Sequence, residues 1–245
     1  MPTDQAEAIV LRTSAIGDQD KLAVFFCREK GIVRGAAKGA RKFGNRFGSS
    51  LEPLSYVRVF YYEKERRELV TVSGCDLLES FFEVQAEPAT AFLLTYFAEL
   101  VEEFAPARAR EDVLFRLLLS VLRGLKAGGD RELAGAYFEA WFLQANGLLP
   151  DLAACRRCGK ALAGGGWLAP AKDGACCPDC ATVQKEKVPA GIQEFLRWVR
   201  KNPPPGSGPA PFPPDLTAAV RRALQALIVY HMEREPRSLH FLKTK

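Results

Sequence analysis

Apolar residues recur at every second position in short runs between residues 7 and 78, and turn residues separate these runs. One run, 54–62, is especially rich in aromatic and β-branched side chains. A period of two is typical of strands, and aromatic and β-branched residues favour them. Five such runs fit within about 75 residues. Because closure of a sheet removes its exposed edges, this part of the chain is predicted to form a small closed β-barrel.

Beyond Pro88 the apolar period lengthens to about 3.6 residues, the repeat of an amphipathic α-helix. Asp130 is a natural N-cap for one of these helices, and Gly147 is a natural stop for it. The apolar faces are wider than a coiled-coil seam, so the helices are expected to pack as a bundle. The expected helices cover residues 92–104, 113–125, 130–146, 192–199 and about 215–235.

The pattern therefore predicts an α+β protein with a β-barrel domain at 1–80 and a helical domain at 81–245. A cysteine-rich module at 155–183 interrupts the helical domain. Residues 202–214 hold seven prolines and two glycines, a composition that forms neither a helix nor a central strand. This segment is predicted to be a proline-rich loop.

The charge of the chain is concentrated in one segment. The formal net charge is only +5, but residues 28–46 hold seven basic residues against the single acid Glu29. This segment alone carries +6, and the remainder of the chain sums to −1. A near-neutral body with one concentrated cationic stretch indicates a surface that faces a polyanion. The seven basic residues are Arg28, Lys30, Arg34, Lys38, Arg41, Lys42 and Arg46.

Glycines and two phenylalanines, Phe43 and Phe47, accompany these cations in a loop that leaves a strand. Glycine lets the backbone approach a phosphate chain, cations displace its counterions, and aromatic rings can stack on unpaired bases. The alternative is a solvated basic loop whose two phenylalanines pack into the rim of the barrel. A second aromatic set, Tyr56, Phe60 and Tyr62, shares one side of a strand. We expect this set to fill the barrel core rather than form a stacking platform, because inward positions of small barrels take large side chains.

Four cysteines form two C-x2-C pairs separated by eighteen residues, Cys155 with Cys158 and Cys177 with Cys180. This spacing lets two tight turns aim four sulfurs at one ion, which predicts a structural Zn²⁺ site with no open position for water. A redox dithiol and unmetallated core cysteines are the alternatives. Cys176 is a rival of Cys177 as a ligand, or else an exposed, oxidisable thiol.

The other two cysteines, Cys27 and Cys75, stand alone in strand-like sequence and are expected to be small buried hydrophobes. Neither histidine, His231 or His240, has a glutamate two positions on, and no phosphate-cradling glycine loop is visible. We therefore expect a non-enzymatic protein. The lack of a long apolar stretch and of a signal-like start favours a cytoplasmic location.

The chain resembles the RecO family of bacterial recombination mediators over nearly its whole length. The stretches that carry the resemblance are 8–22, 31–42 with 46–54, and 147–159. The resemblance implies an OB-fold followed by a helical domain with an embedded zinc finger. It places the basic motif on Arg34, Lys38, Arg41 and Lys42, and the zinc ligands on Cys155, Cys158, Cys177 and Cys180. The proline-rich segment and residues 238–243 depart from the family pattern.

The resemblance also implies a function in the RecF pathway of DNA repair and homologous recombination. Such a protein binds single- and double-stranded DNA, anneals complementary strands, and with RecR helps RecA replace single-strand-binding protein (SSB). Arg46 joins the predicted DNA contacts because it lies in the same basic loop. Two other hypotheses remain: a protein adaptor with little DNA contact, and a zinc-ribbon nucleic-acid enzyme without a recognised catalytic motif.

Overall fold

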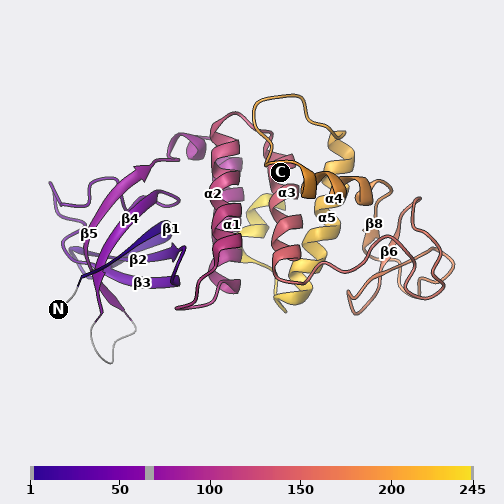
Figure 1. Ribbon diagram of the computed structural model, residues 1–245, viewed down its shortest axis with the longest axis horizontal. Coiled ribbons are helices and arrows are strands. Elements are labelled where there is room, and N and C mark those ends of the chain that lie inside the picture. Colours follow the sequence, from indigo (N-terminus) through magenta and orange to yellow (C-terminus); the bar gives the residue numbers. More distant parts are fainter. Residues whose placement is uncertain (1–2, 64–68, 244–245) are drawn as a thin grey trace. The chain divides into compact units, whose positions relative to one another are not determined.

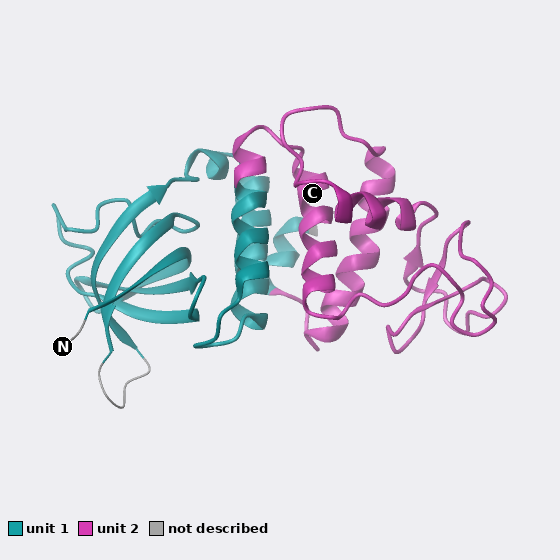
Figure 2. Ribbon diagram, viewed as in Figure 1, with its two compact units in different colours: residues 1–122, 237–245 teal, residues 123–236 magenta. Residues whose placement is uncertain are grey.

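The computed structural model describes residues 3–63 and 69–243. By compactness the chain divides into unit 1, residues 1–122 with 237–245, and unit 2, residues 123–236 (Figure 2). The predicted domains, 1–80 and 81–245, are divided where the strands give way to helices and not by compactness. That division stays a prediction.

Unit 1 holds a closed barrel with the strand order β1-β2-β3-β5-β4 (Figure 1). Its neighbouring strands pair antiparallel, except that β3 and β5 run parallel. The predicted α+β class, an OB-like barrel followed by helices, is confirmed. The strands are β1 (Asp4–Ile16), β2 (Asp20–Cys27), β3 (Gly31–Ala37), β4 (Tyr56–Tyr62) and β5 (Val70–Glu79).

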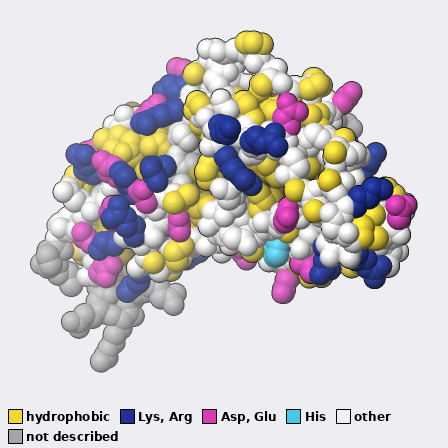
Figure 3. Space-filling view, turned by 45° about the vertical axis from the view of Figure 1, so that its right-hand side comes forward, with side chains coloured by type: hydrophobic (Ala, Val, Ile, Leu, Met, Phe, Trp, Pro, Cys, Tyr) yellow, Lys and Arg dark blue, Asp and Glu magenta, His cyan; other side chains and the backbone are white. Residues whose placement is uncertain are grey.

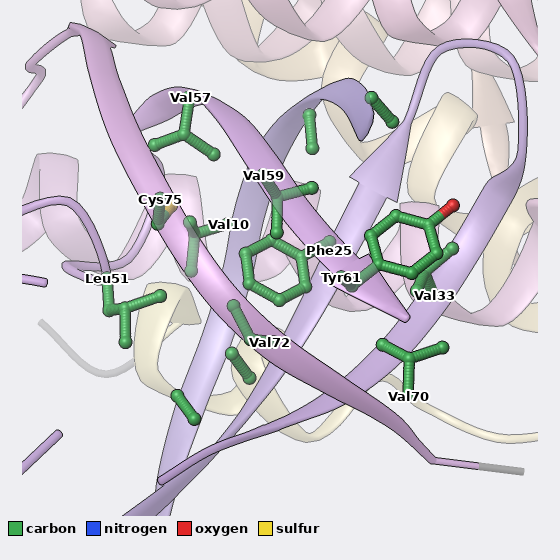
Figure 4. Close-up of a cluster of buried hydrophobic side chains, with 14 of the residues drawn as sticks. Val10, Phe25, Val33, Leu51, Val57, Val59, Tyr61, Val70, Val72 and Cys75 are labelled. Atoms are coloured by element: carbon green, nitrogen blue, oxygen red, sulfur yellow. The ribbon is translucent and has the colours of Figure 1, made fainter. Parts of the chain in front are cut away.

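The barrel interior is an apolar cluster to which each of these strands contributes (Figure 4). Phe25 from β2 and Val59 from β4 point into it, and both are completely buried. Cys27 and Cys75 lie in the same cluster, as expected. Burial raises the pKa of Cys27 to about 12 and that of Cys75 to about 11, so both stay neutral thiols.

The prediction for the aromatic set on β4 is wrong. Val57, Val59 and Tyr61 fill the barrel core, whereas Tyr56, Phe60 and Tyr62 lie half-buried on the outer side of the strand. Tyr56 donates a hydrogen bond to Glu7 at 2.8 Å and packs its ring edge-on against Phe115 of α2. Both sides of β4 carry large apolar or aromatic side chains. The alternation therefore predicts a strand but does not predict which side faces the core.

The helices of unit 1 are η1 (Glu83–Ala86), α1 (Pro88–Phe104), the greater part of α2 (Asp112–Lys126) and α6 (Arg237–Lys243). The pattern of apolar residues predicted α1 and α2 but not α6. Glu99 of α1 holds α6, because its carboxylate accepts hydrogen bonds from the backbone N–H groups of Arg237 and Ser238 at 2.9 Å. The side chain of Leu239 is fully buried.

Unit 2 contains α3 (Arg131–Ala145), α4 (Ile192–Lys201) and α5 (Pro214–His231). Asp130 caps α3 as predicted, with its carboxylate accepting from the Leu133 N–H at 2.7 Å. Arg221 of α5 forms a buried ion pair with Glu139 of α3 at 3.1 Å. A short sheet accompanies these helices in the order β7-β6-β8. Its strands are β6 (Gly166–Leu168), β7 (Ala175–Cys176) and β8 (Lys187–Val188).

The proline-rich segment contains no helix or strand up to residue 213, and Pro214 begins α5. The segment packs against α4 of unit 2. Phe212 is buried, and its ring lies 5.2 Å from Phe195 and 5.6 Å from Trp198 of α4. Asn202 accepts a hydrogen bond from the Tyr137 hydroxyl at 2.9 Å.

Barrel closure depends on Gly35 of β3, which pairs with Val70 of β5. A Cβ at residue 35 would lie 2.6 Å from Cγ2 of Val72 and 3.0 Å from Cγ2 of Val70. We expect Gly35→Ala to lower the free energy of unfolding by roughly 1–3 kcal/mol, as overpacking of a core does. Gly74→Ala is the matched control, because its Cβ would lie 3.5 Å from Phe60, an ordinary contact. Urea titration followed by circular dichroism measures both, and equal midpoints would contradict the tight closure.

Candidate functional site

The basic segment at 28–46 separates into two groups with different partners. The first three cations form ion pairs with carboxylates of unit 1, so their charge is largely compensated. Among the residues that the structure describes, no carboxylate pairs with the other four cations, which are all exposed. The compensated pairs are Arg28–Asp112, Lys30–Asp4 and Arg34–Glu102. The uncompensated cations are Lys38, Arg41, Lys42 and Arg46.

These four cations lie in the loop that follows β3, here named the basic loop (residues 38–48). The turn between β1 and β2 and the first residue of β2 hold its first half. The Asp20 carboxylate accepts from the Gly39 N–H at 2.8 Å, and the Gln19 carbonyl accepts from the Arg41 N–H at 3.0 Å. Arg41 also donates from Nη1 to the Gly17 carbonyl at 3.0 Å. The sequence of the basic segment does not predict these partners, because they lie about twenty residues earlier in the chain.

Asn45 organises the second half of the basic loop. Its Oδ1 accepts from the backbone N–H groups of Phe47 at 3.0 Å and Gly48 at 3.2 Å, and its Nδ2 donates to the Lys42 carbonyl at 3.1 Å. The guanidinium carbon of Arg46 lies 4.8 Å from the centroid of the Phe47 ring. The loop is therefore tied to itself as well as to the barrel.

The two phenylalanines of the basic loop have opposite environments. Phe47 is 3% exposed and belongs to the apolar cluster of the barrel, whereas Phe43 is 107% exposed. The alternative that both rings pack into the rim is thus true of Phe47 alone. Phe43 lines a hollow of about 400 Å³ together with Lys38, Lys42 and Arg46. The hollow combines an apolar ring with three positive charges.

Arg34 lies apart from this group. It is on the outer side of β3, and its Nη2 donates to Glu102 of α1 at 3.0 Å. Arg12 also donates to Glu102, at 2.7 and 2.9 Å. Burial alone would raise the pKa of Glu102, but its bonds with Arg12 and Arg34 lower it overall. Glu102 therefore stays ionised, and Arg34 as a DNA contact remains a prediction.

The four cysteines of the two C-x2-C pairs come together in unit 2. Their sulfur atoms all lie within 4.8 Å of one another, and the Sγ atoms of Cys158 and Cys177 are 3.8 Å apart. Four sulfurs at about 2.3 Å from one ion would be about 3.8 Å apart, the edge of the tetrahedron. The cluster could therefore hold a metal ion of tetrahedral preference.

Tight turns position these sulfurs. The Gly159 N–H donates to the Cys155 carbonyl at 2.8 Å, and Gly159 adopts a φ of 72°. Backbone N–H groups of Cys177 and Cys158 donate to the Cys155 thiolate and lower its pKa to about 6. Hydrogen bonds among the sulfurs raise the pKa of Cys180 to about 12. Four thiols packed so closely cannot all ionise, and a bound dication removes this conflict.

Cys176 does not join the cluster. It pairs with Trp167 in the β6–β7 ladder and is 6% exposed, so the expectation of an exposed thiol is wrong. The alternation of side chains along an extended segment sends the two consecutive cysteines, Cys176 and Cys177, in opposite directions.

Basic and acidic side chains are mixed over part of the surface. On the face shown in Figure 3, many lysine and arginine side chains lie next to aspartate or glutamate side chains.

Within residues 3–63 and 69–243, no helix combines the length and the apolar character that crossing a membrane requires.

Two family models match this sequence. The model described as "Recombination protein O N terminal" covers residues 1–81, and the one described as "Recombination protein O C terminal" covers residues 85–240. The chain belongs to the RecO family.

Relatives of this RecO family member match it over almost the full length of both chains. A protein of Koribacter versatilis named "DNA repair protein RecO" is 34% identical over 94% of this chain and 94% of its own. A protein of the same name from Pelotomaculum thermopropionicum is 32% identical over 97% of this chain and 93% of its own. A third protein of that name, from Roseiflexus, is 32% identical over 97% of this chain and 84% of its own.

The contrast between the two phenylalanines gives a stability prediction. Phe47→Ala should lower the free energy of unfolding of the barrel by roughly 3–5 kcal/mol, because it empties a core position. Phe43→Ala should change it by less than about 0.5 kcal/mol, because the ring contacts solvent. Thermal and urea unfolding of the two variants measure the difference. A comparable loss in both would mean that Phe43 is part of the packing.

Proposed function

We propose that this chain is a DNA repair and recombination mediator that binds single- and double-stranded DNA through its basic loop. The observation that carries the proposal is the group of four exposed cations, Lys38, Arg41, Lys42 and Arg46, that no described carboxylate neutralises. Cations in that state are available to displace the counterions of a phosphate chain. Membership of the RecO family and the names of its relatives support the same assignment.

The proposed activity makes and breaks no covalent bond. A cationic surface offsets the repulsion between two phosphate chains and raises the local concentration of both, which promotes annealing of complementary strands. We further propose, from the family resemblance, that the chain acts with RecR to help RecA replace SSB on single strands. A cytoplasmic location is part of this proposal.

We also propose that the four-cysteine cluster binds a structural Zn²⁺ ion. Cys155, Cys158, Cys177 and Cys180 would hold it, and four sulfurs complete a tetrahedral shell without a position for water. When bound, the ion supplies a cross-link between the two turns and neutralises the thiolates. The turns themselves orient the sulfurs through backbone hydrogen bonds.

The DNA-binding proposal predicts a dependence on salt. If each of the four cations meets one phosphate, log affinity for single strands should fall with log salt at a slope of about −3, from roughly 0.7 per contact. Replacing Lys38, Arg41 and Lys42 by alanine should make the slope shallower by about 2. Fluorescence anisotropy with a labelled oligonucleotide across a salt series measures both slopes.

A matched control removes three exposed cations from α4, namely Arg197, Arg200 and Lys201. An equal loss in both triple variants would assign binding to net charge rather than to the basic loop. Unchanged affinity of the loop variant would instead favour the adaptor hypothesis.

The mediator function needs a separate experiment. Complementary oligonucleotides coated with SSB should anneal faster when the chain is added, and the acceleration should fade as salt rises. The loop variant should accelerate annealing much less than the α4 variant does. Failure of the unmodified chain to anneal coated strands, with DNA binding intact, would remove the mediator function and leave the binding function.

The metal proposal predicts different behaviour of two neighbouring cysteines. Cys177→Ser should reduce the zinc content from about one ion per chain toward zero and lower the thermal stability of unit 2. Cys176→Ser should keep the ion, because Cys176 lies outside the cluster. Elemental analysis and thermal unfolding of both proteins provide the test. Retention of zinc by Cys177→Ser and its loss from Cys176→Ser would reverse the ligand assignment.

A further inference from the structure

Phe43 has no packing function in the barrel. Phe47, four residues later, occupies the core, and Phe43 is fully exposed. A single exposed apolar side chain is common at a protein surface and needs no explanation by itself. Phe43 is informative because it also lines a hollow together with three cations.

The backbone on both sides of Phe43 is held in place. The carbonyl of Lys42 accepts from Nδ2 of Asn45, and the N–H of Lys42 donates to the Gly39 carbonyl at 3.0 Å. Gly44 adopts a φ of 65°, which lets the chain turn directly after the ring. The ring is thus presented by an ordered turn, so little conformational freedom is lost when a ligand stacks on it.

The hollow beside the ring has the chemistry of a nucleotide site. Its volume of about 400 Å³ lies within the range of small-molecule sites, about 300–1,000 Å³. Lys38, Lys42 and Arg46 line it together with Phe43. The one acid in its lining is Asp20, whose carboxylate accepts a hydrogen bond from the Gly39 N–H, so the lining with its three cations stays net positive. An apolar face beside several cations fits a flat aromatic group joined to phosphates.

We propose that this hollow takes one unpaired nucleobase of a DNA strand, stacked on Phe43, while the adjoining phosphates contact Lys38, Lys42 and Arg46. This inference rests on the proposed DNA-binding function and deepens it by naming the preferred substrate. A base in a duplex is paired and stacked on both faces, so it must leave the helix before it can stack on a side chain. The cations bind single strands and duplexes alike, and Phe43 adds affinity for single strands only.

The test compares variants at residue 43 on three ligands of equal length: oligo-dT, an abasic strand with the same phosphates, and a blunt two-strand duplex without unpaired bases. Phe43→Ala should weaken binding of oligo-dT by roughly 5- to 100-fold, the effect of losing one base–aromatic stack. Binding of the abasic strand and of the duplex should change less than about twofold. Phe43→Trp should keep the affinity for oligo-dT, because it restores a stacking face.

Phe82→Ala is the matched control, since Phe82 is another exposed phenylalanine of unit 1, 68% exposed and outside the basic loop. It should leave the affinity for all three ligands unchanged. Equal weakening of all three ligands by Phe43→Ala, or no weakening, would overturn the stacking site while leaving salt-dependent DNA binding in place. If the unmodified protein bound none of the three even at low salt, the proposed function itself would fail.

Discussion

The parallel pairing of β3 with β5 closes the barrel, and the rest of unit 1 depends on it. Two parallel neighbours cannot be joined by a tight hairpin, so the chain must make a long excursion before β5. The basic loop is the first part of that excursion. The closure brings Val70 and Val72 against a position where only a glycine, Gly35, leaves enough room. The backbone geometry of the barrel thus creates the loop that presents the cations.

Two kinds of contact keep this excursion from moving freely. Phe47 returns to the barrel core, and the basic loop forms hydrogen bonds with Gln19 of the β1–β2 turn and with Asp20 at the start of β2. Apolar burial therefore fixes one end of the basic loop and hydrogen bonds fix the other. Between these anchors the side chains of Lys38, Lys42 and Phe43 are left to face solvent. A charged surface that is already ordered loses less entropy on binding than a mobile one.

The cations of the basic segment differ in whether they have an internal partner. Arg28 and Arg34 pair with carboxylates of the helices in unit 1, where they join the barrel to α2 and α1. Lys38 and Lys42 have the same sign of charge but no such partner among the described residues. The cysteine cluster in unit 2 depends less on residues that are distant in the sequence. Its geometry comes from two tight turns and short-range backbone hydrogen bonds.

The sequence by itself determined the features whose causes lie within a few residues. The period of two predicted the strands, the Asp130 cap predicted the start of α3, and the C-x2-C spacing predicted which sulfurs converge. The tertiary structure decided which face of β4 is internal, which of Phe43 and Phe47 is buried, and that residues 237–243 form α6. It also decided that Arg34 is paired, because its partner Glu102 is 68 residues away. Local sequence patterns predict features that depend on neighbouring residues along the chain. Burial and charge compensation depend on residues that only folding brings together.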